Sequence, residues 1–78
     1  MVWSETAAFK NRRGKLKRRQ RESLQHAVYK VRQSPLVGKP LKGEFKKLRI
    51  LSYTYKGEEK RLVYLASEDE LILIEFGP

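Results

Sequence analysis

The apolar pattern of this 78-residue chain changes its period at Ser34-Pro35, and this change constrains the fold more than any other feature. Before it, apolar residues recur at i, i+3, i+4 and i+7, the spacing of one helix face; they are Leu24, Ala27, Val28 and Val31. The helix is expected to end there, because the residue before a proline is pushed out of the helical region. After it, apolar and aromatic residues form short runs typical of strands. The sequence therefore predicts helices followed by a sheet.

The predicted order of elements is β-α-α-β-β-β. A short strand at 2–4 precedes a first helix, which begins near Glu5, has Ser4 as its N-cap and ends at Gly14. This helix is expected to direct Ala7, Ala8 and Phe9 towards the core. A second helix spans about 15–33, a loop spans 35–45, and strands are expected at 48–55, 61–66 and 71–76. A turn of three to five residues around Gly57 joins the first two of these strands.

The length allows one domain, residues 1–78, with a small core. We expect an α+β fold in which an N-terminal helical hairpin packs on a small twisted antiparallel sheet. The chain has no cysteine and one histidine, which excludes a disulfide framework and argues against a structural zinc site. No cofactor or metal is expected. The N-terminus lacks the apolar core of a signal peptide, so the cytoplasm is the expected compartment.

The charge is distributed unevenly along the chain. Residues 1–51 carry 15 Lys and Arg against three acids, a net +12, whereas residues 52–78 carry a net −3. Such asymmetry indicates a polyanion or an acidic protein as a partner. It does not distinguish the two.

A basic run between Arg12 and Arg21 holds seven Lys and Arg in ten residues. Like charges this close repel one another, which favours a phosphate-binding surface over an ordinary solvated helix face. The candidate nucleic-acid contacts in this run are Arg12, Arg13, Lys17, Arg18, Arg19 and Arg21.

The predicted strands carry a second set of candidates. If strands 48–55 and 61–66 pair, Arg49 and Arg61 lie on neighbouring strands, and we expect their guanidinium groups to converge on a scissile phosphate. Lys46 and Lys47 are further nucleic-acid candidates. Tyr53, Tyr55 and Tyr64 are placed to stack on a base or donate a proton, although aromatic residues also favour strands for packing alone. His26 has no evident catalytic partner, and Glu68 to Glu70 read as a turn.

The sequence resembles the RelE/ParE family of bacterial toxins in several places. Val2-Trp3-Ser4 is similar to the family's first strand, Pro35 to Gly43 with Leu48-Arg49 to its helix-to-strand connection, and Arg61 to Tyr64 with Leu71 to Gly77 to its last strands. The resemblance implies a helical hairpin on a twisted antiparallel sheet. It also implies a co-expressed antitoxin protein as partner, and growth inhibition by one of two routes. The RelE branch cleaves mRNA in the ribosomal A site without metal, and the ParE branch inhibits DNA gyrase.

Carried over by position, the resemblance makes Arg61 the arginine at the scissile phosphate and places Arg49 where the RelE branch often has a catalytic lysine. The sequence departs from that branch at Leu51, where a second lysine is missing, and in a longer hairpin around Gly57. It also ends at Pro78, without the family's C-terminal tail and its further Arg or His and Tyr. This predicts impaired catalysis.

Three functions remain open from the sequence. The first is a ribosome-dependent mRNA endonuclease, the second a ParE-type gyrase inhibitor, and the third a non-catalytic RNA-binding module.

Overall fold

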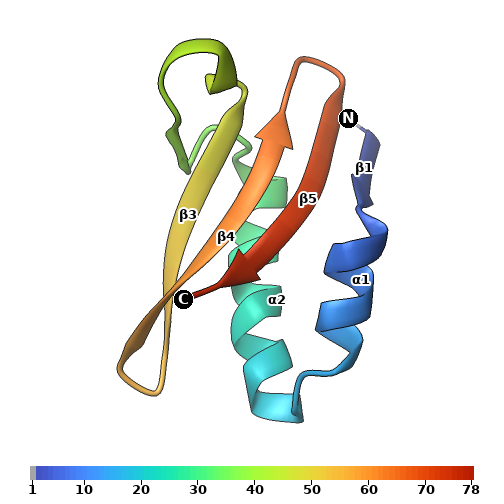
Figure 1. Cartoon of the computed structure of the whole chain (residues 1–78), viewed down its shortest axis with the longest axis vertical. Coiled ribbons are helices and arrows are strands. Elements are labelled where there is room, and N and C mark those ends of the chain that lie inside the picture. The colour runs from blue at the N-terminus through green and yellow to red at the C-terminus, as the bar shows by residue number, and fades with distance from the viewer. Residues whose placement is uncertain (1) are drawn as a thin grey trace.

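The computed structural model describes residues 2–78, which form two helices on one face of a five-stranded sheet (Figure 1). The strands are β1 (Val2–Glu5), β2 (Lys39–Pro40), β3 (Leu48–Tyr55), β4 (Glu58–Ala66) and β5 (Glu70–Gly77), and the helices are α1 (Ala7–Gly14) and α2 (Arg18–Gln33). A single 3-10 turn spans Gly43–Phe45. The predicted α+β class and helical hairpin are therefore confirmed. No helix within residues 2–78 is long and apolar enough to cross a membrane.

The sheet order is β1-β5-β4-β3-β2. All neighbouring strands are antiparallel except β1, which pairs in parallel with β5. The first strand of the chain thus lies beside the last, so the sheet joins the two ends of the sequence (Figure 1). The chain then enters α1 directly from the edge of the sheet.

Thr6 fixes the start of α1. Its Oγ1 accepts a hydrogen bond from the Phe9 amide at 3.1 Å and donates one to the Ile74 carbonyl at 3.0 Å, which ties the helix to β5. The predicted N-cap, Ser4, is wrong because Ser4 still pairs with Ile72 inside β1. The register of β1 therefore delays the helix by one or two residues.

The core lies between the helices and the sheet. Its buried residues are Phe9 of α1, Leu24, Ala27 and Val31 of α2, and Leu62, Tyr64, Leu71, Leu73 and Phe76 of the sheet. The helical stripe expected from the sequence is confirmed, with Val28 packed at its margin. The expectation that Ala7 and Ala8 also point inward is wrong, since both are exposed. Each fully buried leucine contributes about 1.5–3 kcal/mol of hydrophobic stabilisation.

The β3–β4 hairpin closes through only two residues, Lys56 and Gly57. Both have positive φ, 50° and 79°, as a type I′ turn requires. The predicted turn of three to five residues is wrong, because Lys56 adopts the left-handed conformation and β4 begins at Glu58. This tight turn sets which residues of β3 and β4 face each other.

Tyr64 anchors the connection between α2 and the sheet. Its hydroxyl accepts a hydrogen bond from the Gly38 amide at 2.9 Å and donates one to the Pro35 carbonyl at 2.7 Å. The side chain is fully buried. The loop after α2 is therefore held by a core residue of β4.

Candidate nucleic-acid interface

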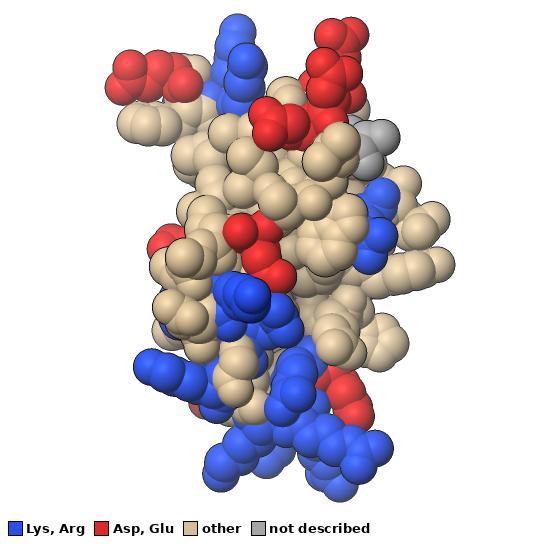
Figure 2. All heavy atoms as spheres, turned by 90° about the vertical axis from the view of Figure 1, so that its right-hand side faces the viewer, with Lys and Arg blue, Asp and Glu red and all other residues tan. Residues whose placement is uncertain are grey.

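Lys and Arg side chains gather at one end of the molecule, which we call the basic end. Figure 2 shows them at the bottom, below the acidic residues that mark the opposite end. The end of α1, the connection and the first turn of α2 supply Arg12, Arg13, Lys15, Lys17, Arg18, Arg19 and Arg21. Within residues 2–78, only Arg13 and Arg18 of this run pair with carboxylates, those of Glu5 and Glu22. The basic run therefore keeps most of its charge for an external anion.

Arg49 and Arg61 lie on opposite faces of the sheet. In the β3–β4 register Arg49 pairs with Tyr64, whereas Arg61 pairs with Ser52. Tyr64 is a core residue, so Arg49 faces the helices, and Arg61, three residues away along β4, faces the other side, here called the open face. The prediction that the two guanidinium groups converge is wrong.

The guanidinium group of Arg49 is occupied by the backbone. Its Nη1 donates hydrogen bonds to the carbonyl of Leu36 at 3.1 Å and to that of Gly38 at 2.7 Å. Leu51, where the RelE branch has its second lysine, packs against the core. Arg49 and Leu51 therefore stabilise the fold on the helix side of β3, Arg49 by binding the loop after α2 and Leu51 by packing on the core.

Two pockets flank the C-terminal end of β5, and Arg12 lines both. The helix-side pocket, of about 150 Å³, is lined by Arg12, Leu16, Gln20, Tyr53, Tyr55, Lys60, Phe76, Gly77 and Pro78. The open-face pocket, of about 330 Å³, is lined by Arg12, Ile50, Arg61, Val63, Glu75, Phe76, Gly77 and Pro78. The Arg12 guanidinium stacks over the Phe76 ring, 4.8 Å from its centre. Arg12 and Arg61 therefore meet at one pocket although Arg49 and Arg61 do not.

The tyrosines differ in their surroundings. Burial raises the pKa of the Tyr53 phenol, while the positive charge of Arg12 opposes that rise. The phenol is therefore neutral at pH 7, where it can donate a hydrogen bond but cannot act as a base. Tyr64 is wrong as a base-stacking candidate, because its ring is fully buried and its hydroxyl holds the Gly38 loop. Of the three tyrosines, Tyr53 and Tyr55 line the pocket at the basic end.

Comparison with known proteins assigns the family. Residues 3–78 match the sequence model of a family described as the ParE-like toxin of type II bacterial toxin-antitoxin systems. The chain belongs to this toxin family. No curated protein matches the toxin in sequence.

Two solved structures have the same fold as the toxin. The isolated Escherichia coli RelE toxin aligns with a TM-score of 0.77 and 20% identity over 96% of this chain and 80% of that one. A chain of the intact E. coli RelBE toxin-antitoxin complex aligns with a TM-score of 0.75 and 18% identity over 96% of this chain and 92% of that one. At such identities the likeness establishes the fold alone. It confirms the RelE-like arrangement of helices on the sheet.

The structure separates the remaining candidates of the toxin. Lys46 and Lys47 precede β3, at the end of the strand away from the Lys56-Gly57 turn, so they do not join Arg12 and Arg61. His26 is exposed on α2. Among residues 2–78, no three His, Cys, Asp or Glu side chains are grouped to hold a metal ion.

Two residues missed by the sequence reasoning also line the pockets. Lys60 pairs with Tyr53 across the hairpin and lines the helix-side pocket. Glu75 pairs with Val63 and lines the open-face pocket. Both positions follow from strand register, which the sequence pattern did not define.

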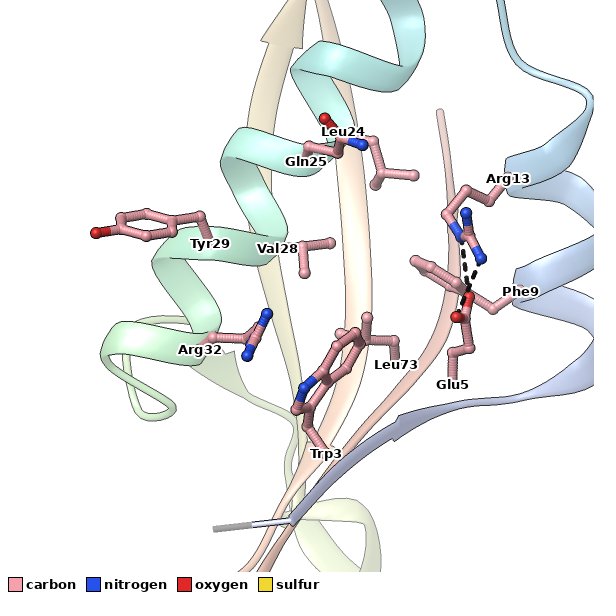
Figure 3. A pocket seen from close by; sticks show the side chains of 10 residues that line it. All are labelled: Trp3, Glu5, Phe9, Arg13, Leu24, Gln25, Val28, Tyr29, Arg32 and Leu73. Carbon is pink, nitrogen blue, oxygen red and sulfur yellow. Dashed lines mark hydrogen bonds and ion pairs between the residues drawn. The ribbon is translucent and has the colours of Figure 1, made fainter.

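A third pocket lies between the two helices and β1, on a different side of the toxin (Figure 3). Its volume is about 400 Å³, and Phe9, Leu24, Val28 and Leu73 supply its apolar lining. At its margin Arg13 donates two hydrogen bonds to Glu5, at 3.0 and 3.1 Å. The Arg32 guanidinium lies 4.3 Å from the centre of the Trp3 ring. This groove, named the hairpin groove, combines apolar surface with cations.

Proposed function

We propose that this toxin is a ribosome-dependent mRNA endonuclease that acts in the cytoplasm and grips a phosphate of the mRNA between Arg12 and Arg61. The observation that carries the proposal is the open-face pocket, which both arginines line. Fixed cations beside a phosphate stabilise the charge that develops on it during cleavage. The surrounding basic run would hold the flanking phosphates.

Cleavage of RNA through its own 2′-hydroxyl also requires a proton acceptor. Glu75 is the carboxylate in the lining of the open-face pocket, and its side chain is exposed. In this proposal Glu75 accepts the 2′-hydroxyl proton while the 2′-oxygen bonds to phosphorus and the bond to the 5′-oxygen breaks, and the leaving 5′-oxygen takes a proton from water. Arg12, which reaches the pocket from α1, and Arg61 of β4 supply the positive charge.

The direct test is cleavage of mRNA positioned on purified ribosomes, read by primer extension. We expect cuts within the ribosomal A site that depend on the ribosome and are absent with the Glu75→Gln variant. Relaxed plasmid with DNA gyrase serves as the parallel assay. Intact mRNA together with blocked supercoiling would contradict the endonuclease proposal.

A gyrase inhibitor is the second candidate, favoured by one specific observation. Arg49 binds backbone carbonyls and Leu51 packs on the core, so β3 brings no cation to the open face at the positions where the RelE branch has lysines. If this candidate holds, growth arrest will persist in Glu75→Gln. A toxin that binds RNA but neither cuts it nor inhibits gyrase would be the RNA-binding module.

We further propose that the partner protein is an acidic antitoxin that covers the hairpin groove. The E. coli RelE fold occurs in a toxin-antitoxin complex, and the groove here presents apolar side chains beside Arg13 and Arg32. Trp3 is 41% exposed and Tyr29 63% exposed at this surface. An amphipathic acidic helix would bury these rings and complement the charge of Arg32, since Arg13 already pairs with Glu5.

Trp3→Ala is expected to weaken antitoxin binding about tenfold or more, since buried tryptophans are frequent hot spots of interfaces. Isothermal titration with the co-expressed antitoxin measures the change, and growth arrest should persist because Trp3 is remote from both pockets of the basic end. Phe45→Ala is the control, because Phe45 is 54% exposed outside the groove. Equal losses in the two variants would argue against docking in the hairpin groove.

A further inference from the structure

The helix-side pocket is built mainly from aromatic surface and hydrogen-bond donors. Tyr53 and Tyr55 of β3 and Phe76 of β5 supply rings, and Gln20 of α2 and Lys60 of β4 supply polar groups. The Lys60 ammonium is held by Glu58 at 3.1 Å. The pocket therefore combines aromatic rings with polar groups, one of which is paired with a carboxylate.

The size of the pocket suits one flat ring. Its volume is about 150 Å³, and a cavity of about that size accommodates a benzene ring. Nucleic-acid bases stack on aromatic side chains irrespective of sequence. The shape thus fits a single-ring base better than a double-ring base.

The polar groups of the pocket are donors. Gln20 Oε1 already accepts a hydrogen bond from the Lys17 amide at 3.0 Å, so its amide nitrogen remains to donate. Arg12 and Lys60 only donate, and the Tyr53 phenol, which is neutral at pH 7, donates through its O–H. The edge of uracil offers these donors two carbonyl oxygens, and a tyrosine hydroxyl oxygen can accept the N3–H that lies between them.

We propose that the helix-side pocket binds one uracil-type base of the RNA, next to the phosphate held in the open-face pocket. Arg12 and Phe76 line both pockets, so the two pockets adjoin each other. This inference rests on the proposed function for the identity of the polymer. A base site here would make the toxin bind the RNA preferentially at positions that carry a uracil-type base.

The test is titration of the ¹⁵N-labelled toxin with uridine 5′-monophosphate and, separately, with ribose 5-phosphate, which lacks only the base. We expect the uridine nucleotide to bind about tenfold more tightly, since stacking contributes that order of affinity. The amide signals of Gln20, Tyr53 and Tyr55 should shift. Equal affinity for the two compounds would reduce the pocket to an anion site and overturn the proposal. Adenosine 5′-monophosphate binding as tightly as the uridine compound would overturn the preference for a single ring.

Two variants localise the effect. Tyr55→Ala removes one ring, and Gln20→Glu keeps an oxygen for the Lys17 amide but removes the donor; each should abolish the tenfold preference. Tyr29→Ala, on the exposed face of α2, should retain it. A preference for the uridine nucleotide that persists in both pocket variants would refute the pocket as the base site. Circular dichroism shows whether each variant is folded, so if one folds poorly the other still decides the test.

The outcome is separable from that of the proposed function, because mononucleotide binding requires neither ribosome nor cleavage. Uridine preference without mRNA cleavage would reject the endonuclease and retain the base site. Cleavage without uridine preference would reject the base site alone.

Discussion

If the toxin cleaves mRNA as proposed, replacing Arg61 with alanine is expected to lower the rate of ribosome-dependent cleavage by about 100-fold, the usual cost of removing one hydrogen-bond donor to a developing negative charge. The Arg61 side chain is exposed on the open face and makes no hydrogen bond or ion pair within residues 2–78, while its backbone pairs with β3 and β5. The fold should therefore be unchanged, and the loss should appear in single-turnover cleavage while the melting temperature stays constant. Arg61→Lys should recover part of the rate, because it restores the charge without the guanidinium fork.

Arg19→Ala is the matched control for this prediction. Arg19 belongs to the same basic end but lines neither pocket. Its removal deletes one phosphate contact at most, so the effect should be a few-fold loss that diminishes as salt is raised. If Arg61→Ala and Arg19→Ala lose activity equally, Arg61 contributes only non-specific electrostatic attraction of the RNA. The proposal that Arg12 and Arg61 bind one phosphate would then be wrong.

The outcome for Arg49 and Arg61 shows where sequence reasoning reaches its limit. The alternation of β3 was predicted correctly, with Arg49 on the same face as Leu51 and Tyr53, and that of β4 likewise. Whether Arg49 and Arg61 share a face of the sheet depends on the length of the turn between β3 and β4. A shift of one residue in register moves every side chain of one strand to the opposite face. The left-handed conformation of Lys56 gives a two-residue turn, and this places Arg49 and Arg61 on opposite faces.

The basic end could be predicted because it is local in sequence, whereas its pockets could not. Seven cations between Arg12 and Arg21 need only a helix connection to cluster. Lys60 and Glu75 join Arg12 only after β4 and β5 have paired in the register observed. The parallel pairing of β1 with β5 is similarly a contact between the two ends of the chain, about which periodicity carries no information.

Gly38→Ala is expected to destabilise the toxin by about 2 kcal/mol, the usual cost of overpacking a closely packed site. A methyl group there would lie 2.7 Å from the Tyr64 hydroxyl and 3.0 Å from the Ile50 carbonyl, both closer than atoms normally approach. For a domain of this size the melting temperature should fall by about 10 °C. Gly14→Ala is the control: nothing lies within 4 Å of its added methyl, and alanine in a helix should raise stability by up to about 1 kcal/mol. A decrease in both variants would point to a general effect of losing glycine.

Tyr64→Phe tests whether the hydroxyl is the cause. Alone, this change leaves the buried Gly38 amide without its acceptor and should cost about 1–3 kcal/mol. In the Gly38→Ala background it should cost less, because removing the hydroxyl also removes the closest clash and the hydrogen bond is already strained. Thermal unfolding of the four proteins of this double-mutant cycle gives the coupling energy. Strict additivity would show that the methyl group is accommodated elsewhere, by movement of the loop away from Tyr64. The loop would then not be anchored as tightly as the two hydrogen bonds of Tyr64 and those of Arg49 imply.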